Sequence, residues 1–334
     1  MTLKKAKWGI LGTSFISKVM AEAIHESKMS ELVAVGSRSQ LTAKAFADQF
    51  TISKYYTEYQ ALLNDPEIDV VYIGLPNHLH KEWIIRCAQA GKHILCEKPF
   101  VLNQKEASEV FSVLETAHVY CMEALMYRYH PLIEKLQTLI QNKIIGEIKF
   151  FNAMYTANIA AIANPTAGGS IRNLGCYPIS LVRLLAGAEP VEITAIGRIN
   201  VDNQNDNQAS AILKFENNVM AVVTTADDME MYSQFDIYGT NGCLKVLTNP
   251  WLPDCVSNKI IIHHHDKAHS VEIDVTAQQS LYTYQIDAMC KKIFSANYLP
   301  AHEKKNWQDT LGNVITLDKW FQQVTMPIAL NASC

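Results

Sequence analysis

The sequence predicts two domains: an N-terminal α/β domain with a parallel sheet, and a C-terminal α+β domain with a large, mostly antiparallel open sheet. Three observations lead to this fold class. Up to about residue 124, short apolar runs alternate with helical patterns, which is typical of a parallel sheet with helices on both faces. Beyond it, seven strand-like runs follow one another closely. A length of 334 residues also favours two cores over one, and we expect domains at 1–124 and 125–334.

The first domain contains five predicted strands. Apolar runs predict them at 7–11, 32–36, 70–74, 92–95 and 119–122, and apolar residues at helical spacing predict helices near 16–24, 43–50, 82–90 and 107–114. A glycine-containing turn, 12–17, joins the first strand to the first helix. This order is that of a Rossmann-type domain.

The second domain has a different rhythm. After helix 132–140 and strand 148–155, a helix at 179–185 precedes strand-like runs at 191–200, 208–215, 219–226, 234–239, 243–247, 259–264 and 270–275. Thr240-Asn241-Gly242 predicts a hairpin turn between two of them, and two helices end the chain. Antiparallel sheets commonly leave one face open, so we expect a homodimer formed through that face, with a higher homo-oligomer as the alternative.

Composition limits the partners and the compartment. A net charge of −4 gives no electrostatic attraction to nucleic acid or to an anionic membrane. No apolar run approaches the ~18 residues of a membrane span, and the N-terminus lacks a signal-peptide core, so we expect a cytoplasmic protein.

We expect neither disulfides nor a metal site. The eight cysteines are scattered without a C-x-x-C pair, and several lie in apolar runs, which predicts reduced core thiols there. Neighbours in His263-His264-His265 would point to opposite faces of a strand. The sequon Asn331-Ala332-Ser333 has no consequence inside a cell.

The strongest chemical signal is Cys96-Glu97-Lys98-Pro99. Pro99 cannot donate to a strand ladder and therefore ends the apolar strand before it. Lys98 then enters the crevice at the carboxyl ends of the strands, where α/β sheets bind ligands. Glu97 can hold the ammonium group or a sugar hydroxyl.

The turn after the first strand predicts dinucleotide binding. Counting from Gly12, Ser14 and Ser17 occupy the second and third positions of a G-x-G-x-x-G pattern. Serine is small enough for close approach, and its hydroxyl can donate to phosphate at the helix N-terminus. We therefore assign Gly12, Thr13, Ser14, Phe15 and Ile16 to the cofactor.

The end of the second strand indicates which cofactor binds. An acidic residue there would hold the ribose hydroxyls of NAD, whereas an arginine accommodates the 2′-phosphate of NADP. The chain has Ser37-Arg38-Ser39 and no carboxylate. Ser37 and Arg38 therefore predict NADP, with NAD as the alternative cofactor.

These motifs, with Gly168–Pro178, resemble the Gfo/Idh/MocA oxidoreductases along essentially the whole chain. Glu97-Lys98-Pro99 is that family's most specific signature, and 75–80 is similar to its loop over the nicotinamide. The segment 123–131 resembles the version in glucose–fructose oxidoreductase and the dimeric dihydrodiol dehydrogenases. The resemblance implies cofactor contacts from Leu75, Pro76, Asn77, His80, Glu97 and Lys98.

The resemblance also implies the catalytic pair. The family places an acid at the position of Tyr177, four residues after an aspartate that is Asn173 here. Tyr177 would then donate a proton to the substrate carbonyl, while Lys98 polarises that oxygen and favours the phenolate form of Tyr177. Arg128, His130, Arg172 and Asn173 are candidate contacts for a sugar, polyol or other hydroxy-carbonyl substrate, and Tyr282 is a further candidate.

A second function class is a cofactor-binding regulator with the same fold and no turnover. Asn173 and the two serines of the turn favour it, whereas Lys98 and Tyr177 argue against it. A second enzyme interpretation is dihydrodiol turnover or reduction of a deoxysugar ketone, and the sequence does not distinguish it from the first.

Overall fold

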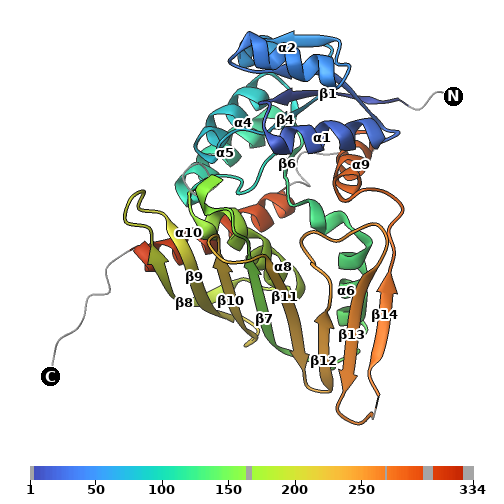
Figure 1. The fold of residues 1–334 in the computed structure, drawn as a ribbon, viewed down its shortest axis with the longest axis vertical. Helices are drawn as coiled ribbons and strands as arrows, with labels where there is room; N and C mark the ends of the chain where they lie inside the picture. Colours follow the sequence, from blue (N-terminus) through green and yellow to red (C-terminus); the bar gives the residue numbers. More distant parts are fainter. Residues whose placement is uncertain (1–3, 163–167, 268, 296–303, 326–334) are drawn as a thin grey trace. The chain divides into compact units, whose positions relative to one another are not determined.

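A computed structural model describes residues 4–162, 168–267, 269–295 and 304–325 (Figure 1). The chain forms two compact units, one of residues 1–130 and 278–311 and the other of residues 131–277 and 312–334. This partition differs from the expected boundary at residue 124. The reason is that helix α9 (Leu281–Ile293) buries Ile286, Met289 and Cys290 in the core of the first unit.

The first unit is built on a six-stranded, fully parallel sheet in the order β3-β2-β1-β4-β5-β6, as predicted for a Rossmann domain. Its strands are β1 (Ala6–Leu11), β2 (Ser30–Gly36), β3 (Lys54–Tyr56), β4 (Val70–Ile73), β5 (His93–Cys96) and β6 (Cys121–Glu123). Its helices before α9 are α1 (Phe15–Glu26), α2 (Gln40–Gln49), α3 (Tyr59–Leu63), α4 (His80–Gln89) and α5 (Gln104–Ala117).

Strand β3 and helix α3 were not predicted. Both are short, and the three residues of β3 are only partly buried or exposed at the edge of the sheet. Such a segment has no apolar run to reveal it. One face of the sheet, by contrast, carries fully buried Trp8, Tyr72 and Leu95 in one core with Met20 of α1.

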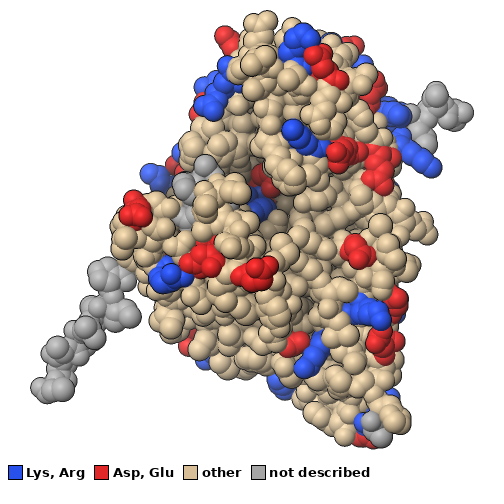
Figure 2. Space-filling view, viewed as in Figure 1, with Lys and Arg blue, Asp and Glu red and all other residues tan. Residues whose placement is uncertain are grey.

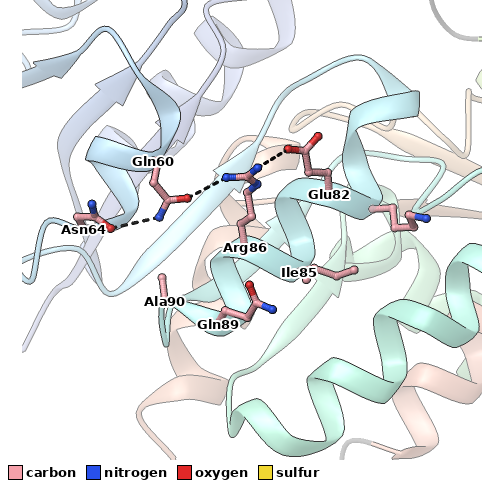
Figure 3. A pocket seen from close by; sticks show the side chains of 8 residues that line it. Gln60, Asn64, Glu82, Ile85, Arg86, Gln89 and Ala90 are labelled. Atoms are coloured by element: carbon pink, nitrogen blue, oxygen red, sulfur yellow. Dashed lines mark hydrogen bonds and ion pairs between the residues drawn. The ribbon is translucent and has the colours of Figure 1, made fainter.

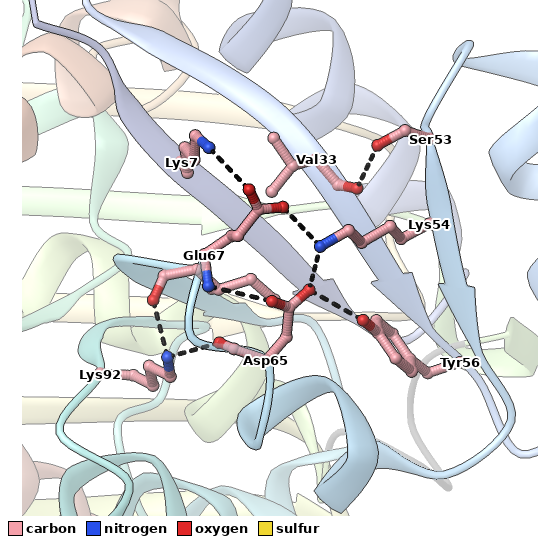
Figure 4. Close-up of polar contacts among 9 residues, drawn as sticks. Lys7, Val33, Ser53, Lys54, Tyr56, Asp65, Glu67 and Lys92 are labelled. Atoms are coloured by element: carbon pink, nitrogen blue, oxygen red, sulfur yellow. Dashed lines mark hydrogen bonds and ion pairs between the residues drawn. The ribbon is translucent and has the colours of Figure 1, made fainter.

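A polar cluster joins strands of this sheet near their amino ends (Figure 4). The Asp65 carboxylate accepts hydrogen bonds from Lys54 Nζ and Tyr56 Oη, both at 2.8 Å. Buried Lys92 donates to the carbonyl oxygens of Asp65 and Ile68, at 2.7 and 2.8 Å. These contacts fasten β3, β5 and the segment before β4 at the edge opposite the predicted site.

The second unit contains an eight-stranded sheet in the order β14-β13-β12-β11-β7-β10-β9-β8. All seven predicted runs are strands, and only the β7–β10 pair is parallel. The strands are β7 (Ile148–Thr156), β8 (Pro190–Ile199), β9 (Asp206–Phe215), β10 (Met220–Ala226), β11 (Tyr232–Gly239), β12 (Gly242–Val246), β13 (Asn258–His264) and β14 (Val271–Val275). Thr240 and Asn241 form the predicted turn between β11 and β12.

Burial alternates along the central strands of this sheet. Ala211, Leu213 and Val223 point to the buried face, which helices α6 (Pro131–Gln141) and α8 (Cys176–Ala186) and the last turns of α10 (Lys304–Thr325) cover. The opposite face carries exposed Ile196 and Ile212. Strand periodicity of two produces this division between the faces.

Of the seven cysteines that the structure describes, five are buried as expected for core thiols, whereas Cys243 is partly exposed and Cys255 is exposed. On the face shown in Figure 2, basic and acidic side chains are interspersed without a continuous basic patch. Within the described ranges, no helix is long and apolar enough to cross a membrane, and no group of three His, Cys, Asp or Glu side chains could hold a metal ion. Asn331-Ala332-Ser333 and Cys334 lie outside the described residues.

Candidate active site

In the first unit, the predicted cofactor residues follow the carboxyl ends of four parallel strands. Residues 12–16 follow β1, 37–38 follow β2, 75–80 follow β4, and 97–98 follow β5. Because the strands are parallel, these segments share one edge of the sheet. This is the edge at which open α/β sheets bind their ligands.

The turn after β1 requires glycine at its first position. Gly12 has a φ of +96°, and a Cβ there would lie 2.7 Å from the carbonyl oxygen of Gly74. The backbone conformation and the close approach of Gly74 both exclude a side chain. The turn therefore leaves the N-terminus of α1 open to an anion such as a pyrophosphate.

The two serines of this turn have structural roles in the helix start. Ser14 is the N-cap of α1, and its hydroxyl accepts a hydrogen bond of 3.3 Å from the Ser17 backbone N–H. Ser17 is fully buried, and its Oγ would lie 2.7 Å from a Cβ on Gly74. Ser17 thus provides the close helix–strand packing of the third glycine. The Ser14 hydroxyl accepts the capping bond with a lone pair, so donation of its proton to a phosphate stays a prediction.

The end of β2 presents Arg38 beside the start of α2. Ser37 is buried, and its hydroxyl lies 2.7 Å from that of Thr42. Ser39 caps α2 by accepting from the Thr42 N–H, so exposed Arg38 stands next to a helix N-terminus. A hollow of about 190 Å³ adjoins this point, lined by Thr13, Lys18, Thr42, Ala45, Phe46 and Gln49. It connects the turn after β1 with α2.

Lys98 sits in a turn that several buried groups hold. Glu97 accepts from the Tyr72 hydroxyl at 2.7 Å and from the Lys98 N–H at 3.2 Å. Burial raises the pKa of Glu97, and Lys98 and the Tyr72 hydrogen bond oppose this effect. The Lys98–Pro99 peptide bond is cis, and the N–H of Phe100 donates to the carboxylate of buried Glu123 at 3.0 Å.

His80 joins this turn to the end of β4. Its Nδ1 lies 2.9 Å from the carbonyl oxygen of Pro99, and its Nε2 lies 2.9 Å from that of Leu75. The ring is fully buried, and burial lowers its pKa. The ring, which has no exposed surface, lies between the two loops, and a contact of His80 with the cofactor stays a prediction. Pro76 is exposed, and Asn77 begins the short helix η1 (Asn77–Leu79).

Two substrate candidates follow β6, around the short helix η2 (Met126–Tyr129). Arg128 forms an ion pair with Asp309 inside the same unit. Burial opposes the charge of Arg128, but the Asp309 carboxylate outweighs this and raises its pKa. His130 is buried and meets the Tyr284 ring edge-on at 5.6 Å. Tyr282 packs against the core of the first unit.

In the second unit, Tyr177 follows a distorted helix start. Gly168 and Gly169 have φ values of +74° and +96°, and residues Ile171–Gly175 form a π-helical turn (η3) that continues into α8. π-Helical turns occur frequently at functional sites. Tyr177 is largely buried and meets Tyr155 edge-on, with ring centroids 5.6 Å apart.

A buried carboxylate anchors the start of this segment. Asp206, the first residue of β9, accepts hydrogen bonds from the Ser170 hydroxyl at 2.5 Å and from the Ile171 N–H at 2.8 Å. Burial raises the pKa of Asp206, and these two bonds oppose the shift. Arg172 lies over the Phe321 ring at 4.1 Å, and Asn173 is largely buried.

Four residues that hold candidate site residues or their segments, three in the first unit and one in the second, were not predicted: Tyr72, Glu123, Asp309 and Asp206. Each acts on a partner that is distant in the sequence, such as Tyr72 on Glu97 or Asp206 on Ser170. Only Glu123 had a signal, because it directly follows a predicted strand at the same sheet edge.

Comparison with known proteins identifies the fold family. Residues 6–125 match the family described as "Oxidoreductase family, NAD-binding Rossmann fold", and residues 133–245 match the "GFO/IDH/MocA C-terminal domain". The chain belongs to the Gfo/Idh/MocA oxidoreductase family. The predicted membership is thus confirmed, and the chain is an oxidoreductase with an NAD(P)-binding Rossmann domain.

The similarity to relatives within this family covers most of this chain and most of each relative. A D-xylose 1-dehydrogenase (NADP(+)) of Haloferax volcanii is 35% identical over 71% of this chain and 74% of its own length. A trans-1,2-dihydrobenzene-1,2-diol dehydrogenase of Xenopus laevis is 32% identical, over 75% and 78%. The crystal structure of KijD10, a 3-ketoreductase from Actinomadura kijaniata in complex with NADP and TDP-benzene, has a TM-score of 0.87 at 25% identity and covers 96% of this chain and 98% of that one.

Proposed function

We propose that this oxidoreductase catalyses reversible hydride transfer between NADP(H) and a sugar, polyol or other hydroxy-carbonyl substrate. The observation that carries the proposal is the fixed turn of Lys98, whose flanking groups are held by His80, Glu97 and Glu123. These contacts fix the backbone of Lys98 at the carboxyl edge of the parallel sheet, where open α/β sheets bind their ligands. The family members named for xylose and for a 3-keto substrate support a carbonyl or hydroxyl reaction centre.

The residues at the strand ends fit a dinucleotide. The glycine turn and the N-terminus of α1 would hold the pyrophosphate, and Arg38 beside α2 would hold the 2′-phosphate. When bound, the nicotinamide supplies or accepts the hydride. Two relatives named with NADP support this choice of cofactor, and NAD is the alternative.

We assign the proton chemistry to Tyr177 and Lys98. The Lys98 ammonium would polarise the substrate oxygen, and the Tyr177 hydroxyl would donate its proton to that oxygen during reduction. Arg128, His130, Arg172 and Asn173 remain the proposed substrate contacts. Because Asp309 already pairs with Arg128, this arginine would present to a substrate only the donors that the carboxylate leaves.

The test is turnover together with binding. NADPH and NADH are incubated with ketoses, ketoaldoses and diketones, and NADP⁺ with sugars and dihydrodiols, while the absorbance of the reduced nicotinamide is followed. We expect turnover of at least one substrate and tighter binding of NADPH than of NADH. Cofactor binding without turnover on any member of the panel would favour the regulator, and tighter binding of NADH would contradict the choice of NADP.

We also propose a homodimer through the open face of the second sheet. Ile196, Ile212 and Met220 are 68%, 50% and 42% exposed on neighbouring strands of that face. Contiguous exposed apolar surface is typical of protein–protein contacts. A monomeric mass by light scattering at micromolar concentration would contradict it.

A further inference from the structure

Tyr72 of β4 places a phenol hydroxyl inside the core of the first unit. Its ring is fully buried, in one core with Trp8 and Leu95. A hydroxyl enclosed in this way needs a hydrogen-bond partner, and it donates to Glu97 Oε1 at 2.7 Å. Burial raises the pKa of Tyr72 well above its ordinary value, and the Glu97 carboxylate adds to this, so the hydroxyl keeps its proton and is the donor.

The pairing of β4 with β5 explains how this contact forms. Tyr72 pairs with Leu95, and Glu97 follows two residues later, so that all three side chains share one face. The ring lies against Gly74, the residue after β4, where a Cβ would lie 2.8 Å from Tyr72 Cε1 and 2.7 Å from Ser17 Oγ. Glycine at residue 74 therefore leaves room for the tyrosine ring beside the end of the strand.

The Glu97 carboxylate connects Tyr72 to the turn of Lys98. Oε1 accepts the bond from Tyr72, and Oε2 accepts a bond of 3.2 Å from the Lys98 N–H. The tyrosine hydroxyl thus fixes the carboxylate, and the carboxylate fixes the first peptide group of the turn. Burial raises the pKa of Glu97, while Lys98 and the bond from Tyr72 lower it; Tyr72 is itself faced by Tyr282 of α9 and by Cys96 of β5.

Two other polar clusters of this unit join different elements. In a polar groove of about 590 Å³ between α3 and α4, Arg86 donates to Gln60 Oε1 at 3.3 Å and pairs with exposed Glu82 at 2.9 Å (Figure 3). Exposed ion pairs of this kind contribute little to stability. Tyr56 donates to Asp65 near the amino ends of the strands. The bond from Tyr72 differs from both, because it ends on a carboxylate that also holds the Lys98 N–H.

We infer that Tyr72 is a positioning residue for the reaction: its hydroxyl orients the Glu97 carboxylate, which holds the backbone of Lys98 at the carboxyl edge of the sheet. Tyr72 is fully enclosed and therefore acts through Glu97. Without the hydroxyl, a buried carboxylate would lose one of its donors, which favours its neutral form. The inference rests on the proposed role of Lys98.

NMR titration of the full chain tests the contact without any substrate. Glutamate side-chain carboxyl carbons and lysine backbone nitrogens are isotopically labelled, and the two signals are identified by their loss in Glu97→Gln and in Lys98→Met. We expect Tyr72→Phe to raise the pH midpoint of the Glu97 signal by about one unit, as for loss of a hydrogen bond to a charged group. The Lys98 amide signal should follow the Glu97 midpoint in both proteins, because the carboxylate accepts from that amide.

Kinetics then test the role in turnover. On a substrate of the wild type, Tyr72→Phe should lower kcat about tenfold at neutral pH, and the acid limb of the pH profile should move upward with the Glu97 midpoint. Tyr56→Phe is the matched control, because it also removes a tyrosine hydroxyl that donates to a carboxylate of the first unit. It should leave kcat and both NMR signals unchanged.

Three results would each overturn the inference: an unchanged Glu97 midpoint in Tyr72→Phe, a Lys98 amide signal that does not respond to Glu97, or wild-type kcat in Tyr72→Phe. The same changes in Tyr56→Phe would assign the effects to lost stability and would also overturn it. If the wild type turns over no substrate of the panel, the proposed function fails, whereas the titration still decides whether Tyr72 holds the Lys98 turn.

Discussion

The Nδ1 atom of His80 lies 2.9 Å from the carbonyl oxygen of Pro99, the residue that follows Lys98. On the other side of the ring, Nε2 lies 2.9 Å from the carbonyl oxygen of Leu75. One buried imidazole thus connects the loop after β4 to the turn after β5. The His80 side chain therefore helps to position the backbone of Lys98. It also helps to position the loop after β4, which is the predicted nicotinamide loop.

Replacing His80 should therefore affect both stability and turnover. We expect His80→Gln to lower the free energy of unfolding by about 2 kcal/mol. The flexible amide of glutamine does not present two nitrogen atoms on opposite sides, as the imidazole ring does toward the two carbonyl groups. It should lower kcat more than it raises the Kd of NADPH, because Lys98 is displaced while the glycine turn is intact. Urea unfolding and steady-state kinetics measure the two effects; wild-type kcat in His80→Gln would contradict the positioning role.

The same residue predicts a pH dependence of stability. Burial is the main cause that lowers the pKa of His80 in the folded state below its ordinary value of 6.5, so the unfolded chain binds this proton more readily. The contribution of His80 to stability is therefore complete above pH 6.5 and is lost as the pH falls through the lower pKa of the folded state. Between pH of about 7.5 and 5, the urea midpoint should fall less in His80→Gln than in the wild type or in a control variant of exposed His78, His78→Gln. If the urea midpoint falls equally with pH in all three proteins, the pH dependence does not come from His80.

Tyr177→Phe tests the proton donor. The substitution removes one hydroxyl from a ring that keeps its edge-on packing with Tyr155, so NADPH affinity should hardly change. We expect kcat to fall by roughly 10²–10⁴-fold, the usual worth of a positioned proton donor. Lys98→Met should lower turnover at least as much and also weaken substrate binding, and the two effects should not add in the double variant. Full activity of Tyr177→Phe on a substrate of the wild type would exclude this role.

Asp206→Ala should disturb the start of the Tyr177 segment. It removes the acceptor shared by the Ser170 hydroxyl and the Ile171 N–H, leaving buried donors unsatisfied. We expect about tenfold lower kcat with unchanged NADPH affinity, the scale of a displaced catalytic group. Asp206→Asn keeps one oxygen acceptor and should retain most activity. If both variants lose activity equally, the geometry of the segment does not depend on this acceptor.

The Asp65 cluster should contribute to stability and leave catalysis unaffected. Burial opposes ionisation, but the hydrogen bonds from Lys54, the Glu67 N–H and Tyr56 lower the pKa of Asp65 from 3.8 to about 2. Its contribution is therefore present above pH 3.8 and is lost as the pH falls through about 2. We expect Asp65→Asn to cost about 2 kcal/mol at neutral pH by urea unfolding and to leave kcat unchanged. A lowered kcat at full occupancy would contradict the separation of this cluster from the site.

Much of the fold followed from patterns that are local in the sequence. Apolar runs and helical spacing predicted the parallel sheet, because strands that are buried on both faces are apolar at consecutive residues. Alternation of apolar and polar residues predicted the seven later strands, because only one of their faces is buried. Gly12, Arg38 and Lys98 could be placed for the same reason: each directly follows a strand of a parallel sheet, and the carboxyl ends of such strands share one edge.

The exceptions were elements without an apolar run and residues whose role is a distant contact. β3 is a short edge strand, and α9 joins the first unit although it follows the second sheet in the sequence. Ser14 and His80 were assigned to the cofactor from their positions, and the cap that Ser14 forms and the two carbonyl groups beside His80 were not predicted.

The sequence by itself therefore determined the family, the order of the elements and the residue types at the strand ends. Only the tertiary structure decided how those residues are held: His80 against Pro99, and Asp206 against Ser170. The physical reason is that hydrogen bonds and ring contacts depend on separations of a few ångströms between residues far apart in the chain. Packing sets these separations, and they leave no periodic pattern of residues in the sequence from which they could be predicted.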